Sequence, residues 1–214
     1  MKIGLQTYLS FGRQLVEKVR EAAPKTEMFL DLKLHDIPNT VWGAANSLQD
    51  LHVDYLTVHA SGGAKMIEAA ARALPETRIA AVTVLTSLSQ DDLLAMGVSA
   101  SAEEIVVRWA QLAESAGARA IVCSPEEVAT VRSVVSEATV LITPGVRPAG
   151  VHSTASNTSH SSDSGARIDD QQRTSTPQVA QDSGADLLVI GRPITSASDP
   201  AQAISAIRRS LHPR

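Results

Sequence analysis

The stretch MFLDLKLHDIPNT at residues 28–40 places an apolar run directly before a group of charged side chains. If residues 28–34 form a strand, successive side chains alternate between its faces, so Asp31 and Lys33 point the same way, about 6 to 7 Å apart. Such charges are costly in surroundings that exclude water unless they are paired, and Asp36 adds another at the end of the strand. The pattern therefore indicates a catalytic site at the end of a buried strand.

Further apolar runs of strand length recur along the chain, separated by segments whose apolar residues follow helical spacing. Ser101 with Glu104 forms a predicted capping box, and Ser124 and Thr176 each precede a proline that suits the first turn of a helix. Repeated alternation of strand and helix predicts parallel strands in a barrel or a doubly wound sheet. The predicted strands cover residues 3–5, 28–34, 55–59, 79–85, 120–124, 139–143 and 187–191.

Polar residues at the ends of separate strands decide between these two architectures. They fall in or directly after the predicted strands, and in a TIM barrel such strand ends converge on one mouth. An open sheet would spread them along a crevice instead. We therefore predict an α/β fold of the TIM (β/α)8 barrel type. The residues concerned are Lys2, Asp31, Lys33, Asp36, His59, Thr86, Arg147 and Arg192.

The composition predicts a single domain over residues 1–214, because a chain of 214 residues with 43% hydrophobic residues can bury a substantial core. A formal net charge of −4 argues against a nucleic-acid surface, which needs a basic face. No apolar run reaches about 18 residues and no secretory signal opens the chain, so we expect no membrane segment and a cytoplasmic protein. The single cysteine, Cys123, is expected to pack as a small hydrophobe in a strand.

The chain resembles the orotidine 5'-phosphate decarboxylases over nearly its whole length. The strongest element is the segment 31–40 quoted above, and further motifs follow it in the family's order. The resemblance implies a homodimeric TIM barrel that needs no metal or organic cofactor and converts orotidine 5'-phosphate to uridine 5'-phosphate in pyrimidine synthesis. The supporting motifs are Lys2-Ile3-Gly4, Leu85-Thr86-Ser87, Thr143-Pro144-Gly145-Val146-Arg147, Asp170-Gln171 and Gly191-Arg192-Pro193.

The resemblance assigns the chemistry to the charged segment. It implies Lys33 as the proton donor, because loss of carbon dioxide leaves a ring carbanion that a fixed ammonium both stabilises and protonates. Asp31 is implied beside the departing carboxylate, and Lys2 completes an alternating array of charges with Asp31 and Lys33. Asp36 and Thr40 are implied to enter the site of the neighbouring subunit, so each active site would need both chains.

Phosphate recognition is expected after the last two strands, the usual anion site of this barrel. Arg147 and the pair Gly191-Arg192 offer guanidinium donors and a backbone amide there, and together they favour an anion over two unrelated surface ion pairs. The resemblance adds Gln171 from the closing loop and Thr86 near the pyrimidine and ribose. The remaining expected substrate-binding residues are Ile37, Thr40 and Pro144.

Two features depart from the family's pattern. Members normally open with another strand, bearing an aspartate for the ribose hydroxyls, and a helix before the segment that matches Lys2-Ile3-Gly4. We therefore expect seven strands with an exposed gap, and interpret Met1 as a truncated or misassigned start. The second feature is the segment 151–168, which is polar and nearly lacks large apolar residues, and which we predict to be a disordered insertion in the phosphate-binding loop.

Two alternatives remain open. A sugar-phosphate decarboxylase or synthase of the same superfamily resembles the chain in its Asp-x-Lys-x-x-Asp segment, but uses magnesium held by an acidic ligand where this chain has Lys2. A cation at that position would repel the metal, so Lys2 favours the metal-free decarboxylase. The missing strand leaves a catalytically impaired nucleotide-binding barrel as the second alternative.

Overall fold

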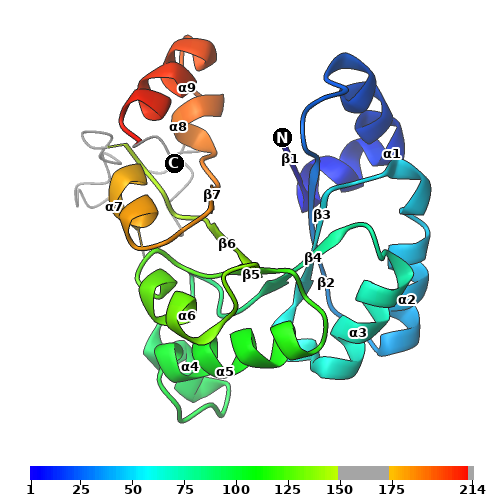
Figure 1. Ribbon diagram of the computed structural model, residues 1–214, viewed down its shortest axis with the longest axis vertical. Coiled ribbons are helices and arrows are strands. Elements are labelled where there is room, and N and C mark those ends of the chain that lie inside the picture. The colour runs from blue at the N-terminus through cyan, green and yellow to red at the C-terminus, as the bar shows by residue number, and fades with distance from the viewer. Residues whose placement is uncertain (149–173, 212–214) are drawn as a thin grey trace, which may run out of the picture.

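The computed structural model describes residues 1–148 and 174–211, which form a curled parallel sheet with helices on its outer side (Figure 1). These residues contain seven strands, each paired in parallel with the next in chain order. The predicted TIM-barrel fold with seven strands is confirmed. The strands are β1 (Lys2–Gly4), β2 (Phe29–Leu34), β3 (Tyr55–His59), β4 (Arg78–Val82), β5 (Ala120–Val122), β6 (Val140–Thr143) and β7 (Leu187–Leu188).

Helices connect successive strands and pack on the convex side of the sheet (Figure 1). This arrangement follows from parallel pairing, because the chain must return to the same end of the sheet before each new strand. The helices are α1 (Leu5–Ala22), α2 (Pro38–Asn46), α3 (Ala64–Ala73), α4 (Gln90–Ala95), α5 (Ala102–Ser115), α6 (Val128–Val134), α7 (Pro177–Asp182), α8 (Arg192–Thr195) and α9 (Pro200–Arg209).

Two of the three helix starts predicted from the sequence are confirmed, and one is wrong. Ser101 caps α5 through a capping box, and Thr176 caps α7 ahead of its first-turn proline. The prediction that Ser124 begins a helix is wrong, because α6 begins at Val128. The Ser124 backbone N–H instead donates to the buried carboxylate of Glu127 at 2.9 Å, which holds residues 124–127 in a turn.

Both faces of the sheet are buried, which explains why the strands read as nearly continuous apolar runs. The outer face packs against the helices in the larger core cluster, where Leu30, Leu56 and Leu141 are fully buried. The inner face carries a second, smaller cluster of alternating positions from successive strands. This inner cluster consists of Phe29, Tyr55, Ala80, Ala120 and Ile142.

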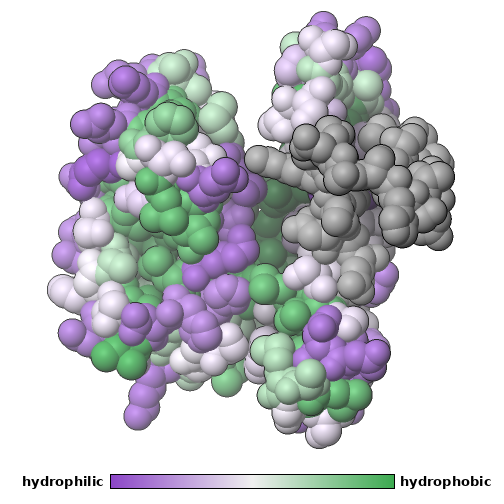
Figure 2. All heavy atoms as spheres, turned by 180° about the vertical axis from the view of Figure 1, so that it is seen from behind, coloured by the Kyte–Doolittle hydropathy of each residue, from purple (hydrophilic) through white to green (hydrophobic). Residues whose placement is uncertain are grey.

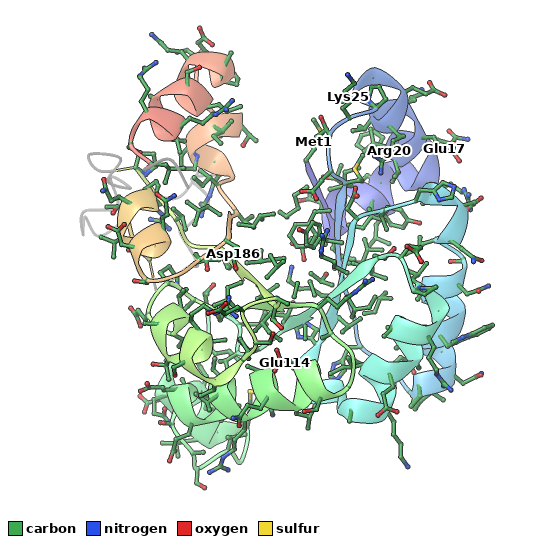
Figure 3. The ribbon with its side chains drawn as sticks, viewed as in Figure 1. Met1, Glu17, Arg20, Lys25, Glu114 and Asp186 are labelled. Carbon is green, nitrogen blue, oxygen red and sulfur yellow. The ribbon has the colours of Figure 1, made fainter. Side chains whose placement is uncertain are left out.

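Polar side chains at the amino ends of the strands tie helices and loops to the sheet. Arg20 of α1 donates to the carbonyl oxygen of His52 at 2.7 Å, and Asp54 accepts from the backbone N–H of Met28 at 2.6 Å. Asp186, just before β7, accepts a backbone N–H of β6 at 2.8 Å. Figure 3 shows Arg20 and Asp186 on opposite sides of the curl. These contacts stabilise the end of the sheet remote from the charged segment.

Within the described residues the sheet does not close, because β1 pairs only with β2 and β7 only with β6. Figure 1 shows α1 on one side of this opening and α8 with α9 on the other. The opposite view in Figure 2 shows apolar and polar residues side by side over the surface of the molecule. None of the helices in the described part combines the length and apolarity needed to cross a membrane.

Candidate active site

Lys2, Asp31 and Lys33 come together on the inner face of the curled sheet. β1 and β2 are neighbours with Gly4 beside Asp31, so Lys2 reaches Asp31 from the adjacent strand. The Nζ atom of Lys2 lies 2.9 Å from Oδ2 of Asp31, and the Nζ atom of Lys33 lies 2.7 Å from Oδ1. A Cβ atom at Gly4 would lie 3.3 Å from Lys2 Nζ, so glycine leaves room for this ammonium.

The Asp31 carboxylate is the most buried member of this charge array. Its side chain is 14% exposed, whereas those of Lys2 and Lys33 are 33% and 34% exposed. Burial raises the pKa of Asp31, but the charges of Lys2 and Lys33 and their hydrogen bonds lower it by more, so the pKa lies below its ordinary value. The carboxylate therefore stays ionised at neutral pH between two ammonium groups.

A bulge in β2 sets the direction of Lys33. Leu30 pairs with Leu56 and Leu34 pairs with Val58, so β2 advances by four residues where β3 advances by two. Lys33 lies in this step with a φ of 52°, a left-handed conformation that residues with a Cβ atom rarely adopt. Bulges of this kind re-aim side chains beside active sites.

Sequence patterns alone do not single out Thr57, which the structure places at the centre of this arrangement. The side chain is fully buried in β3. Its Oγ1 atom accepts the backbone N–H of Lys33 at 2.8 Å and donates to Oδ1 of Asp31 at 3.1 Å. The two-residue period of a strand puts Thr57 on the same face as His59, and that period is the signal that could have found it.

His59 lies beside the array at the end of β3. Its ring centroid is 5.4 Å from that of His35. Burial lowers the pKa of His59, and electrostatic interactions with His35 and Lys33 lower it further. The imidazole is therefore neutral at neutral pH and adds polarity to the site without a further positive charge.

The charge array forms one wall of a cavity of about 190 Å³ at the carboxyl ends of the strands. Most of its lining residues are apolar and come from β2, β4, β5, β6 and β7 or the residues just after them, so the cavity combines an apolar floor with a charged wall. A flat ring with polar substituents suits such a site. The lining residues are Lys2, Phe29, Asp31, Lys33, Val82, Val84, Leu85, Thr86, Val122, Cys123, Ile142, Pro144 and Val189.

Several residues expected from the sequence share this cavity. Thr86 and Pro144 line it together with the charge array, and Cys123 is buried in its wall, as predicted for a small hydrophobe. Leu85 and Val189 also line the cavity, although the sequence analysis placed them in predicted strands and assigned neither a role in the site.

Another group of expected residues lies outside the cavity. Asp36, Ile37 and Thr40 are exposed at the start of α2, and the carboxylate of Asp36 accepts the backbone N–H of Ile37 at 2.7 Å. None of these three residues lines the cavity of this chain. A role for them in catalysis therefore requires a site other than the one in their own chain.

The two expected arginines follow the neighbouring strands β6 and β7. The backbone N–H of Arg147 donates to the carbonyl oxygen of Ser175 at 2.8 Å, which joins the segment after β6 to the segment before α7. Arg192 is the first residue of α8, and Gly191 is the residue that precedes this helix. Gln171 and the predicted insertion at 151–168 lie outside the described residues.

The donor set of the cavity differs from that of a metal centre. Within the part of the chain that the structure describes, no three His, Cys, Asp or Glu residues are grouped so that they could hold a metal ion. Asp31 is the carboxylate that lines the cavity, and its oxygens already accept from Lys2 and Lys33.

Comparisons with known proteins agree with this geometry. The family model described as "Orotidine 5'-phosphate decarboxylase / HUMPS family" matches residues 1–207. The chain belongs to this family. A curated relative from Thermobifida fusca (strain YX), named orotidine 5'-phosphate decarboxylase, is 54% identical over 211 residues, which cover 99% of this chain and 84% of the relative.

The chain is also similar to a second curated relative in sequence and to a solved structure in fold. A protein of the same name from Anaeromyxobacter sp. (strain K) is 47% identical over 212 residues, covering 99% of this chain and 86% of the relative. A crystal structure of orotidine 5'-phosphate decarboxylase from Lactobacillus acidophilus superimposes with a TM-score of 0.79 and 33% identity, covering 98% of this chain and 85% of that one. Family membership thus rests on the whole described fold as well as on the motifs.

Proposed function

We propose that this chain decarboxylates orotidine 5'-phosphate to uridine 5'-phosphate, with Lys33 as the proton donor. The observation that carries the proposal is the Lys2–Asp31–Lys33 array in the wall of an otherwise largely apolar cavity. The reaction is inferred from the names of the relatives. The array provides ammonium groups that can stabilise and protonate a carbanion.

The reaction breaks the bond between the pyrimidine ring carbon and its carboxylate. The electron pair of that bond stays on the ring carbon while carbon dioxide leaves. A preorganised ammonium stabilises the developing negative charge most strongly where water is excluded. The proton of Lys33 then forms the new carbon–hydrogen bond, and Lys33 regains a proton from solvent after product release.

Asp31 holds the two ammonium groups in place before substrate arrives. Its carboxylate accepts from Lys2 Nζ at 2.9 Å and from Lys33 Nζ at 2.7 Å, so neither cation needs to reorganise during the reaction. In the bound substrate the departing carboxylate would face Asp31, and its loss as neutral carbon dioxide relieves that repulsion. We assign the larger share of catalysis to attraction by Lys33.

The rest of the nucleotide is assigned to the loops after β6 and β7. In this proposal Arg147, Arg192 and Gln171 bind the phosphate, together with the backbone of Gly191. Thr86 contacts the pyrimidine and ribose, and Pro144 packs against them, since both residues line the cavity.

The exposed start of α2 supports a homodimer in which Asp36 and Thr40 complete the partner's site. Ile37 is 66% exposed and Trp42 is 43% exposed, so apolar surface surrounds these polar groups. A surface hollow between α2 and α3 lies beside them, lined by Pro38, Asn39, Trp42, Ala69 and Arg72. Association would bury this surface and bring Asp36 toward the partner's Lys33.

Mixing two inactive variants tests the shared site. If Lys33→Ala and Asp36→Asn are each inactive, a mixed dimer contains one site with both changes and one with neither. Activity should therefore return on mixing, to at most about a quarter of the wild-type rate for random exchange of subunits. Light scattering must show a dimer in each variant, and mixtures without recovered activity would contradict the shared site.

Absorbance loss of orotidine 5'-phosphate with the wild type and with Lys33→Ala tests the central assignment. The substitution should remove nearly all turnover, because it deletes the acid and the charge that stabilises the carbanion. Lys18→Ala, a change at an exposed position of α1, is the matched control and should retain the wild-type rate. Turnover retained by Lys33→Ala would exclude Lys33 as the acid, and uridine 5'-phosphate binding without turnover by the wild type would indicate a binding protein.

A further inference from the structure

The hydroxyl group of Thr57 connects the backbone of Lys33 to the side chain of Asp31. It accepts the Lys33 N–H at 2.8 Å and donates to Asp31 Oδ1 at 3.1 Å. The same Asp31 oxygen accepts from Lys33 Nζ at 2.7 Å. The hydroxyl therefore closes a ring of contacts that runs from the Lys33 backbone through Thr57 and Asp31 to the Lys33 ammonium.

The bulge in β2 explains why a side-chain hydroxyl, and not a backbone carbonyl, accepts the Lys33 N–H. In a regular strand the Lys33 N–H would point to the β1 side, as does that of Phe29, which donates to the carbonyl oxygen of Met1. The register shift between Leu30 and Leu34 turns the Lys33 N–H toward β3 instead. The left-handed conformation of Lys33, with φ at 52°, needs support from the surrounding structure to persist. Thr57 Oγ1 supplies the acceptor for this redirected N–H.

We infer that Thr57 is a positioning residue that keeps Lys33 in its bulged conformation and orients Asp31, so that the Lys33 ammonium faces the cavity. This inference rests on the proposed function, in which Lys33 is the acid. Thr57 is not among the residues that line the cavity. Its effect would act through the placement of Lys33.

Threonine has the chemistry that this position requires. Its hydroxyl accepts from an N–H and donates to a carboxylate at the same time, whereas valine of similar shape offers neither contact. The branched Cβ restricts the χ1 angle, which fixes the direction of the hydroxyl in a strand. Serine keeps both hydrogen bonds with a less restricted side chain.

Kinetics of Thr57→Val and Thr57→Ser test the inference. Thr57→Val should lower kcat by about 100-fold, because displacement of a reacting group by about 1 Å has an effect of that size, while KM changes by less than about threefold. Thr57→Ser should stay within about tenfold of the wild-type kcat, since it restores the hydroxyl.

Thr77→Val is the matched control. Thr77 is a buried threonine just before β4, and its hydroxyl donates to the carbonyl oxygen of Val53 at 2.8 Å, at the opposite end of the sheet. It should lose a similar amount of thermal stability and keep its kcat. A Thr57→Val enzyme with a kcat within about threefold of wild type, or a kcat loss in Thr77→Val equal to that in Thr57→Val, would overturn the inference.

A crystal structure of Thr57→Val separates this inference from the proposed function. We expect a changed φ at Lys33 and a longer distance from Lys33 Nζ to Asp31. If Lys33→Ala keeps its activity, the proposed function fails while this structural test still decides the role of Thr57. An unchanged Lys33 backbone and ion pair in Thr57→Val would refute the inference even if Lys33 proves to be the acid.

Discussion

Replacing Asp31 with asparagine should inactivate the chain while leaving it folded. The carboxamide keeps the shape of the side chain but removes the negative charge that holds Lys2 and Lys33. It also turns a donor toward one of the ammonium groups, because the carboxamide has one oxygen and one nitrogen. The two cations then repel each other on the wall of the cavity without a counterion between them.

The expected loss of stability in Asp31→Asn follows from how far the charged groups of the array are exposed to water. Hydrogen bonds to charged groups contribute about 1.5 to 3 kcal/mol each, but water recovers part of this because each lysine is about a third exposed. We expect a loss of about 2 kcal/mol in the free energy of unfolding, or a Tm lower by about 4 to 8 °C. A domain with about 5 to 15 kcal/mol of stability remains folded after such a loss.

The effect on catalysis should be larger than the effect on folding. Removing a preorganised electrostatic group from an active site commonly lowers kcat by about 100-fold to 1,000-fold, which corresponds to about 3 to 4 kcal/mol. The assay is absorbance loss of orotidine 5'-phosphate, with urea unfolding of the same samples followed by circular dichroism.

Asp54→Asn provides the control for this experiment. Asp54 accepts the backbone N–H of Met28 at 2.6 Å at the amino end of the sheet, so the substitution should lower the Tm and leave kcat unchanged. A value of kcat for Asp31→Asn within about tenfold of wild type would refute the assigned role of the carboxylate.

Three further predictions follow from the same structure. Because the two lysines hold the pKa of Asp31 below its ordinary value, the stability advantage of wild type over Asp31→Asn should be complete above about pH 5 and disappear as the pH falls below about 3.9 through the lowered pKa, measured by urea unfolding at each pH. Ser101→Ala removes the capping box of α5 and should cost about 1 kcal/mol in urea unfolding without changing kcat, whereas a lost activity would show that α5 contributes to the site. Treatment with EDTA should leave the decarboxylation rate unchanged, and a loss restored by magnesium would favour the metal-dependent alternative.

The alternation of apolar and charged residues predicted much of the site without a structure. Residues 29–34 are a strand, and Asp31 and Lys33 both line the cavity, although a bulge and not regular alternation sets the direction of Lys33. The caps at Ser101 and Thr176 are local as well, since a side chain bonds the backbone three residues away. The predicted start at Ser124–Pro125 was wrong, because residues 125–127 form a turn and α6 begins only at Val128.

Contacts between residues of different strands could not be predicted from the sequence and became visible only in the tertiary structure. Local patterns do not predict that β1 pairs with β2. That pairing brings Lys2 Nζ within 2.9 Å of Asp31 Oδ2. The register shift opposite β3 and the left-handed backbone of Lys33 are equally invisible to local patterns.

Local patterns in the sequence were enough to predict the strand–helix alternation and the charged segment at the end of one strand, because both depend on neighbours within a few residues. Contacts between strands set the pairing of Lys2 with Asp31, the bulged backbone of Lys33 with its support by Thr57, and the apolar walls beside the charges. The physical reason is that a left-handed residue costs about 1 to 2 kcal/mol on its own, so it persists only where contacts distant in the sequence stabilise it.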